Sequence, residues 1–204
     1  ASFEHHYIIV EDGVVVDVCQ AIPEAYAKVP VTEFGDDVII PAFSDLHVHA
    51  PQYPQRGLGM DLLLSDWLNT YTFPQEARYA APEYAAAVYG AFLKSLMENG
   101  TFHACVYGTI HREATSGLLE KMEAQNLRAY VGKVNLDIQS PEYLCETTEE
   151  SLRETEIFLE TYAGNQYAKP IITPRFAPTC SFELLKGLGK LGKKYQAGMQ
   201  THLV

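Results

Sequence analysis

The apolar residues of this chain follow two spacings, one typical of β-strands and one typical of helices. Residues 7–18 contain two β-rich runs on either side of Asp12 and Gly13, a pair that favours a tight turn, so we predict a hairpin there. A run that begins at Val38 is apolar on both faces, as in a buried parallel strand, and we expect it to lead into His47.

Beyond residue 50 the pattern alternates between helix and strand. Apolar side chains recur every three or four residues between Pro82 and Gly100, which predicts a long helix that begins near the proline and ends at the glycine. Thr147 and Glu150 have the spacing of a capping box, which predicts the start of another helix. In all, we predict helices over residues 61–71, 82–99, 116–125, from 147 onward and 181–195, and strands over residues 38–50, 101–108, 128–136, 169–175 and 197–203.

This alternation predicts an α/β fold with a parallel sheet, either open or closed into a barrel. We expect two unequal domains. Residues 1–40 hold the hairpin and a stretch interrupted by prolines, and residues 41–204 hold the alternating helices and strands.

Composition and charge exclude several classes of protein. The net charge is -11 and no basic block is present, so a nucleic-acid partner is not expected, because phosphate binding needs clustered Lys and Arg. No apolar run approaches the length that spans a membrane, so no membrane partner is expected either. The four cysteines are dispersed, which argues against a zinc finger, a redox pair and a disulfide scaffold and favours reduced thiols in the cytoplasm.

Two histidines one residue apart, His47 and His49, are the strongest chemical signal in the chain. Side chains at positions i and i+2 of a strand point to the same face, so both imidazoles can reach one metal ion. The alternative is a polar strand end with two solvated histidines. His202 lies near the end of the last predicted strand, and three histidines at strand ends on one face would form a nitrogen-rich pocket for Zn²⁺ or a similar divalent ion.

Other candidates give weaker signals. Arg175 ends a predicted strand, so we expect it at the same edge of the sheet as the histidines, where the carboxyl ends of the strands meet. His111, just past a strand end, is expected to be a surface residue rather than a support for the site. His103, inside its strand, is expected to be a packing residue.

The sequence resembles the guanine deaminases, a family within the amidohydrolase superfamily. The resemblance rests on Asp45-Leu-His-Val-His-Ala-Pro-Gln-Tyr53, Asp61-Leu-x-Leu-x-x-Trp67, Tyr71-Thr-Phe-Pro-x-Glu76, Thr109-Ile-His111, Val131-Gly-Lys-Val134, Glu146-Thr-Thr-Glu-Glu-Ser151, Thr173-Pro-Arg-Phe176 and Thr201-His-Leu203, which occur in order from about residue 38. It implies a (β/α)₈ TIM-type barrel, of which about the first five βα units are present here. The hairpin before it resembles the amino-terminal part of the small β-sandwich that this family builds from both chain ends.

The resemblance also implies a site and a reaction. His47, His49 and His202 match zinc ligands, with one Zn²⁺ per active site. The residues that match the family's substrate-binding positions are His49, Ala50, Pro51, Gln52, Arg175, Phe176 and His202. The implied reaction is zinc-dependent hydrolytic deamination of guanine to xanthine and ammonia, with a purine as the partner and a homodimer as the complete assembly.

No catalytic proton-transfer residue is expected within this chain. The family's acid–base glutamate would follow His202 by two or three residues, and the sequence ends at Val204, so we expect these residues to be the amino-terminal portion of a longer deaminase. Two alternatives remain open from the sequence. One is another cyclic-amidine deaminase or amidohydrolase of the same superfamily, and the other is a non-catalytic fragment that lacks the downstream carboxylates.

Overall fold

The computed structural model describes residues 2–203 and divides the chain into two compact units, Ala1–Ile40 and Pro41–Val204. In the first unit, strand β1 (Tyr7–Glu11) pairs antiparallel with β2 (Val14–Cys19), which confirms the predicted hairpin. Asp12 and Gly13 both have positive φ, 47° and 78°, as a two-residue turn matched to the twist of the strands requires. A short 3₁₀ helix, η1 (Glu24–Tyr26), follows.

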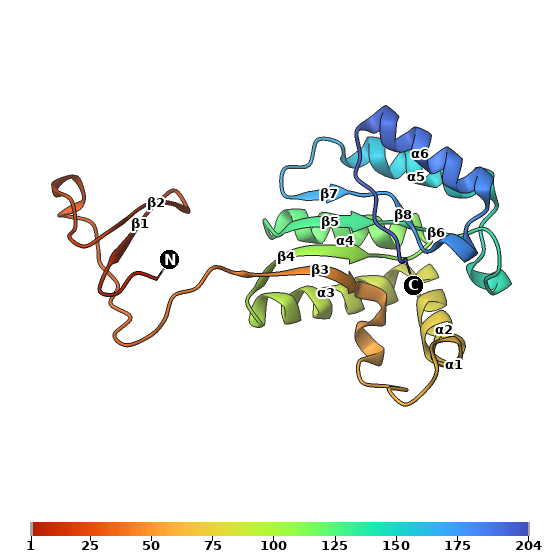
Figure 1. The fold of residues 1–204 in the computed structure, drawn as a ribbon, viewed down its shortest axis with the longest axis horizontal. Helices are drawn as coiled ribbons and strands as arrows, with labels where there is room; N and C mark the ends of the chain where they lie inside the picture. Colours follow the sequence, from red (N-terminus) through yellow and green to blue (C-terminus); the bar gives the residue numbers. More distant parts are fainter. Residues whose placement is uncertain (1, 204) are drawn as a thin grey trace. The chain divides into compact units, whose positions relative to one another are not determined.

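The second unit is built on a parallel sheet, which confirms the predicted α/β class. The strands β3 (Phe43–His49), β4 (Thr101–Tyr107), β5 (Arg128–Gly132) and β7 (Ala168–Pro170) lie side by side in that order (Figure 1). Two short strands, β6 (Val134–Asn135) and β8 (Thr173–Pro174), form a second parallel pair just beyond β5 and β7. In the four-stranded sheet, neighbours are consecutive along the chain except that the short β6 lies between β5 and β7 in sequence.

Helical segments connect these strands. The segments of four or more residues are η2 (Ala50–Gln55), α1 (Leu64–Trp67), the π-helical η3 (Leu68–Thr72), α2 (Phe73–Ala77), α3 (Pro82–Glu98), α4 (Arg112–Ala124), α5 (Thr148–Tyr162) and α6 (Phe182–Tyr195). Three 3₁₀ turns are shorter: η4 (Arg78–Ala80), η5 (Glu142–Leu144) and η6 (Ala177–Thr179). None of the helices within residues 2–203 combines the length and the apolar character needed to cross a membrane.

Side-chain caps fix where two of the helices begin. The hydroxyl of Thr147 accepts a hydrogen bond from the backbone N–H of Glu150, as the capping-box spacing predicted, and Ser181 caps α6 through Leu184 in the same way.

The hydrophobic core lies between one face of the sheet and the helices. Ala104 and Val106 of β4, and Ala129 and Val131 of β5, pack against helical side chains such as Leu118. Because side chains alternate along a strand, the intervening residues of β4 and β5 point to the opposite face of the sheet. That opposite face carries the residues of the site described below.

Three predicted strands differ from the structure. Val38–Ile40 is not a strand, and Val38 is 84% exposed, so the buried strand predicted from residue 38 is wrong at its start. Pro41 lacks a backbone N–H, and ladder pairing begins only where Phe43 meets Thr101. The predicted strands over 128–136 and 169–175 are each interrupted, at Lys133 and at residues 171–172.

Two further predictions need correction. The segment 197–203 is not a continuous strand, because its backbone pairing among the described residues consists of the isolated bridges Ile172–Met199 and Phe176–His202. The helix predicted over 61–71 starts later, at Leu64, and its second half is π-helical. Pro74 explains this irregularity in part, since it offers no N–H to the preceding turn.

Candidate metal and ligand site

Three histidines meet at the carboxyl end of β3. His47 and His49 lie two residues apart on that strand, and His202 reaches them from the segment that follows α6, the last helix of the chain in Figure 1. One nitrogen of each of the three imidazoles lies within 4.8 Å of the others. The structure therefore brings together the three residues that the sequence singled out as candidate metal ligands.

Hydrogen bonding fixes which nitrogen of His202 faces this cluster. Nδ1 of His202 lies 2.6 Å from the carbonyl oxygen of Arg175. A carbonyl oxygen only accepts, so Nδ1 carries the proton and Nε2 presents a lone pair to the other two histidines. The Arg175 carbonyl thereby orients His202, as a support behind a metal ligand does.

The spacing of the nitrogens fits a cation better than it fits hydrogen bonding among the histidines. Nε2 of His202 lies 3.0 Å from Nε2 of His49 and 3.2 Å from Nε2 of His47. The single lone pair on Nε2 of His202 accepts one N–H, so it cannot accept hydrogen bonds from both His47 and His49. Burial lowers the pKa of His49 well below its usual range and also lowers the pKa of His202, which favours the neutral imidazoles that a metal needs.

Tyr107 packs against all three histidines, a contact that is not evident from the sequence. Its ring stacks on His49 with centroids 4.4 Å apart, and its centroid lies 4.6 Å from that of His202 and 5.0 Å from that of His47. Burial raises the pKa of Tyr107 to about 12, so the phenol stays protonated. Tyr107 pairs with His49 at the end of the neighbouring strand, and this position is the signal that could have identified it as part of the site.

The residues after His49 form a fixed turn beside the cluster. Ala50 and Pro51 are buried in η2, and the hydroxyl of Tyr79 donates a hydrogen bond to the carbonyl oxygen of Pro51 at 3.0 Å. Gln52 follows in the same turn and is half-buried. These three predicted ligand-binding residues therefore lie in one anchored segment that begins at a histidine of the cluster.

Arg175 is buried and paired rather than exposed. Its Nη1 lies 2.5 Å from Oε2 of Glu76 and its Nη2 lies 3.1 Å from Oε1, a bidentate ion pair with Glu76 of α2. Phe176 is half-buried, and its backbone bridges to His202. No role for Glu76 follows from the sequence alone.

His111 is not a simple surface residue, which corrects the expectation for it. It is half-buried before α4, and its Nε2 is buried without a hydrogen-bond partner among residues 2–203. Burial, with the nearby charge of Lys133, lowers its pKa. His103 is half-buried within β4 and pairs with the hydroxyl of Ser44 at 3.2 Å, as a packing residue does.

Gln200 attaches the His202 segment to the sheet. Its Nε2 donates to the Val106 carbonyl at 3.1 Å and to Oγ1 of Thr173 at 2.9 Å, and its Oε1 accepts from the thiol of Cys105 at 2.9 Å. A Cβ at Gly132 would lie 1.7 Å from Oγ1 of Thr173, so only glycine leaves room for this network. Gln200 thus fixes a segment that has only two isolated backbone bridges, two residues before His202.

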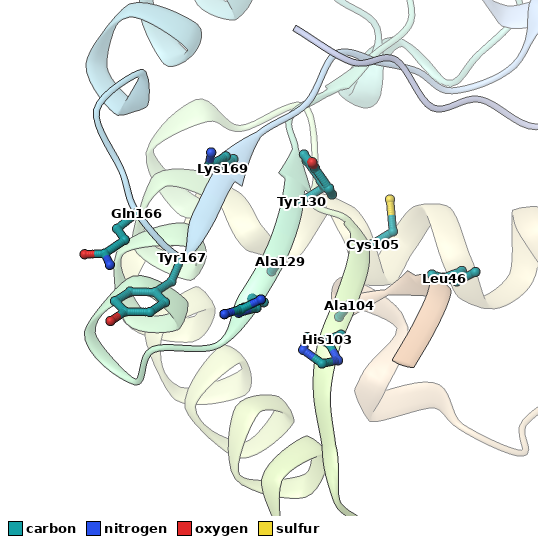
Figure 2. A pocket seen from close by; sticks show the side chains of 10 residues that line it. Leu46, His103, Ala104, Cys105, Ala129, Tyr130, Gln166, Tyr167 and Lys169 are labelled. Atoms are coloured by element: carbon teal, nitrogen blue, oxygen red, sulfur yellow. The ribbon is translucent and has the colours of Figure 1, made fainter. Parts of the chain in front are cut away.

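A hollow on the sheet lies away from the histidine cluster. It has a volume of about 500 Å³ and is lined by Leu46, His103, Cys105, Tyr130 and Lys169, among others (Figure 2). His103 and Lys169 lie near the amino ends of their strands, whereas the histidine cluster lies at the carboxyl ends. This hollow therefore does not contain the candidate metal ligands.

Comparison with known proteins agrees with these features. The sequence profile of the Amidohydrolase family matches residues 38–204. A guanine deaminase of Dictyostelium discoideum is 42% identical over 175 residues, which are 85% of this chain and 39% of that protein. The guanine deaminase of Escherichia coli (strain K12) is 38% identical over 174 residues, again 85% of this chain and 39% of that protein.

A solved structure extends the match to three dimensions. It is a guanine deaminase from C. acetobutylicum with guanine bound in its active site, with a TM-score of 0.94 and 44% identity, covering 97% of this chain and 48% of that one. The chain thus spans about two fifths of the length of the curated relatives and about half of the solved structure.

The Gln200 network gives a prediction for stability. Replacing Gln200 with Ala leaves two buried acceptors and a thiol without their partner, so we expect the free energy of unfolding to fall by about 1–3 kcal/mol in urea titrations. Gln125→Ala, at an exposed helix end, is the matched control and should change it by less than about 0.5 kcal/mol. Equal effects of the two substitutions would contradict the role given to Gln200.

Proposed function

The chain belongs to the amidohydrolase family, and we propose that it carries the metal- and purine-binding part of an enzyme that hydrolyses guanine to xanthine and ammonia. The observation that carries this proposal is the convergence of three imidazole nitrogens within 4.8 Å, one of them on a histidine that is hydrogen-bonded to the carbonyl of the buried Arg175. The likeness to a structure that holds guanine supports the choice of substrate. The proposal includes a fold in which residues 41–204 are the first five βα units of a TIM-type barrel and residues 1–40 are part of a β-sandwich.

The donor set fits Zn²⁺ as the metal. Neutral imidazoles are among the preferred ligands of Zn²⁺, and His47, His49 and His202 offer three of them on one side. When bound, Zn²⁺ would supply Lewis acidity that lowers the pKa of water and makes it a nucleophile near neutral pH. The role of the chain is to hold these three ligands in place, through the β3 backbone, the ring of Tyr107 and the Arg175 carbonyl.

The residues around this cluster would bind the purine. A guanidinium has five N–H groups, and the pairing with Glu76 engages one on each Nη of Arg175, so three remain for the carbonyl and ring nitrogen of guanine. Phe176 offers an aromatic face, and Gln52 offers an amide that both donates and accepts. His49, Ala50, Pro51 and His202 complete the proposed binding site. The proposal assigns no proton-transfer carboxylate among residues 2–203.

Turnover with a panel of substrates tests this function. The full-length enzyme that carries these residues, purified and loaded with Zn²⁺, should convert guanine to xanthine with a higher kcat/KM than it shows for adenine, cytosine or an amino-triazine. A chelator should abolish the activity, and added Zn²⁺ should restore it, because the reaction would need a water molecule activated by the metal. Preference for another ring, or turnover that survives complete metal removal, would contradict the proposal.

A conservative substitution tests the role of Arg175. Arg175→Lys keeps the charge but loses the planar fork, so guanine should lose at least one charged hydrogen bond, worth about 1.5–3 kcal/mol or about a 10- to 150-fold fall in kcat/KM. Zinc content should stay unchanged. Arg128→Lys, exposed at the amino end of β5, is the control and should leave kcat/KM unchanged. A loss smaller than about threefold in the Arg175 variant would mean that the guanidinium does not contact the substrate.

A further inference from the structure

The ion pair between Glu76 and Arg175 is buried, and Arg175 is hydrogen-bonded to a histidine of the cluster. Glu76 is 2% exposed and Arg175 is 6% exposed. They come from α2 and from the turn after β8, and each carboxylate oxygen accepts a hydrogen bond from one terminal nitrogen of the guanidinium. Two hydrogen bonds fix the orientation of the planar guanidinium, whereas a single hydrogen bond would leave it free to rotate.

Arg175 is also tied directly to a candidate metal ligand. Its carbonyl oxygen accepts hydrogen bonds from the backbone N–H of His202 at 3.2 Å and from Nδ1 of the same histidine at 2.6 Å. The positively charged side chain and the metal ligand therefore belong to adjacent, hydrogen-bonded segments. A dication bound by the histidines would be repelled by an unpaired guanidinium in this buried environment, because the interaction between charges is strong at low effective dielectric.

We propose that Glu76 is a positioning and charge-balancing residue, which fixes the Arg175 guanidinium for the purine and cancels its repulsion of the metal. This rests on the proposed function for the purine, but its effect on the metal needs no substrate. Glu76 does not touch the reacting atoms in this account. It acts only through Arg175, so its removal should be harmful mainly while Arg175 is still present.

That dependence gives a test by a cycle of variants. Glu76→Gln keeps the shape of the side chain and removes its charge. The double variant R175M/E76Q removes both charges and leaves no buried charge unpaired. Glu113→Gln, in the exposed first turn of α4, removes one negative charge away from the pair and is the matched control.

The first measurement is the dissociation constant for Zn²⁺ alone, by competition with a chromophoric chelator at fixed pH. We expect Glu76→Gln to bind Zn²⁺ about 10-fold or more weakly than the unsubstituted protein. R175M/E76Q should return to within about threefold of it, and Glu113→Gln should not differ. Unchanged affinity in Glu76→Gln, or equally weak binding in the double variant, would overturn the charge-balancing role.

The second measurement is steady-state kinetics on guanine. Glu76→Gln should raise KM and lower kcat, and R175M/E76Q should remain poor on guanine although its zinc affinity is restored. Recovery of guanine turnover in the double variant would overturn the positioning role. If the protein prefers another substrate, the zinc measurement still decides the charge-balancing role, so the two proposals fail separately.

Folding is checked by circular dichroism. Should Glu76→Gln not fold, charge balance predicts that R175M/E76Q does fold and binds Zn²⁺, because it buries no unpaired charge. A double variant that folds no better than Glu76→Gln would then overturn the proposal.

Discussion

The hydrogen bond from Nδ1 of His202 to the Arg175 carbonyl is the interaction on which the rest of the site depends. It determines which nitrogen of His202 faces His47 and His49, and it joins the segment that ends the described chain to the turn after β8. The side chain of the same arginine is held by Glu76. Through one residue, the structure therefore couples the orientation of a proposed metal ligand to the orientation of a proposed purine contact.

The fold supports this arrangement from both faces of the sheet. On one face, small and branched residues of β4 and β5 pack against α3, α4 and α5, which fixes the strands. On the other face, Gln200 connects β4, β8 and the His202 segment, and Gly132 leaves the space for it. Because the last segment has only isolated backbone bridges, side-chain hydrogen bonds supply much of its placement.

Local patterns in the sequence predicted most of the secondary structure and the three histidines. Alternation along β3 placed His47 and His49 on one face, and the capping spacing at Thr147 marked the start of α5. Interactions over long distances in the sequence could not be predicted. Glu76 meets Arg175 across 99 residues, and Tyr107 meets the histidines only because β3 and β4 pair in one register. The exposed residues Val38–Ile40 show the opposite error, since an apolar run indicated a strand where Pro41 and the absence of a ladder partner prevent one.

The central claim is that His47, His49 and His202 bind one metal ion together. X-ray absorption spectroscopy of the protein loaded with one equivalent of Zn²⁺ tests this most directly. The account predicts scattering from about three imidazole nitrogens at about 2.0–2.1 Å, and the loss of one imidazole in His202→Ala. A spectrum without imidazole scattering, or one that His202→Ala leaves unchanged, would contradict it.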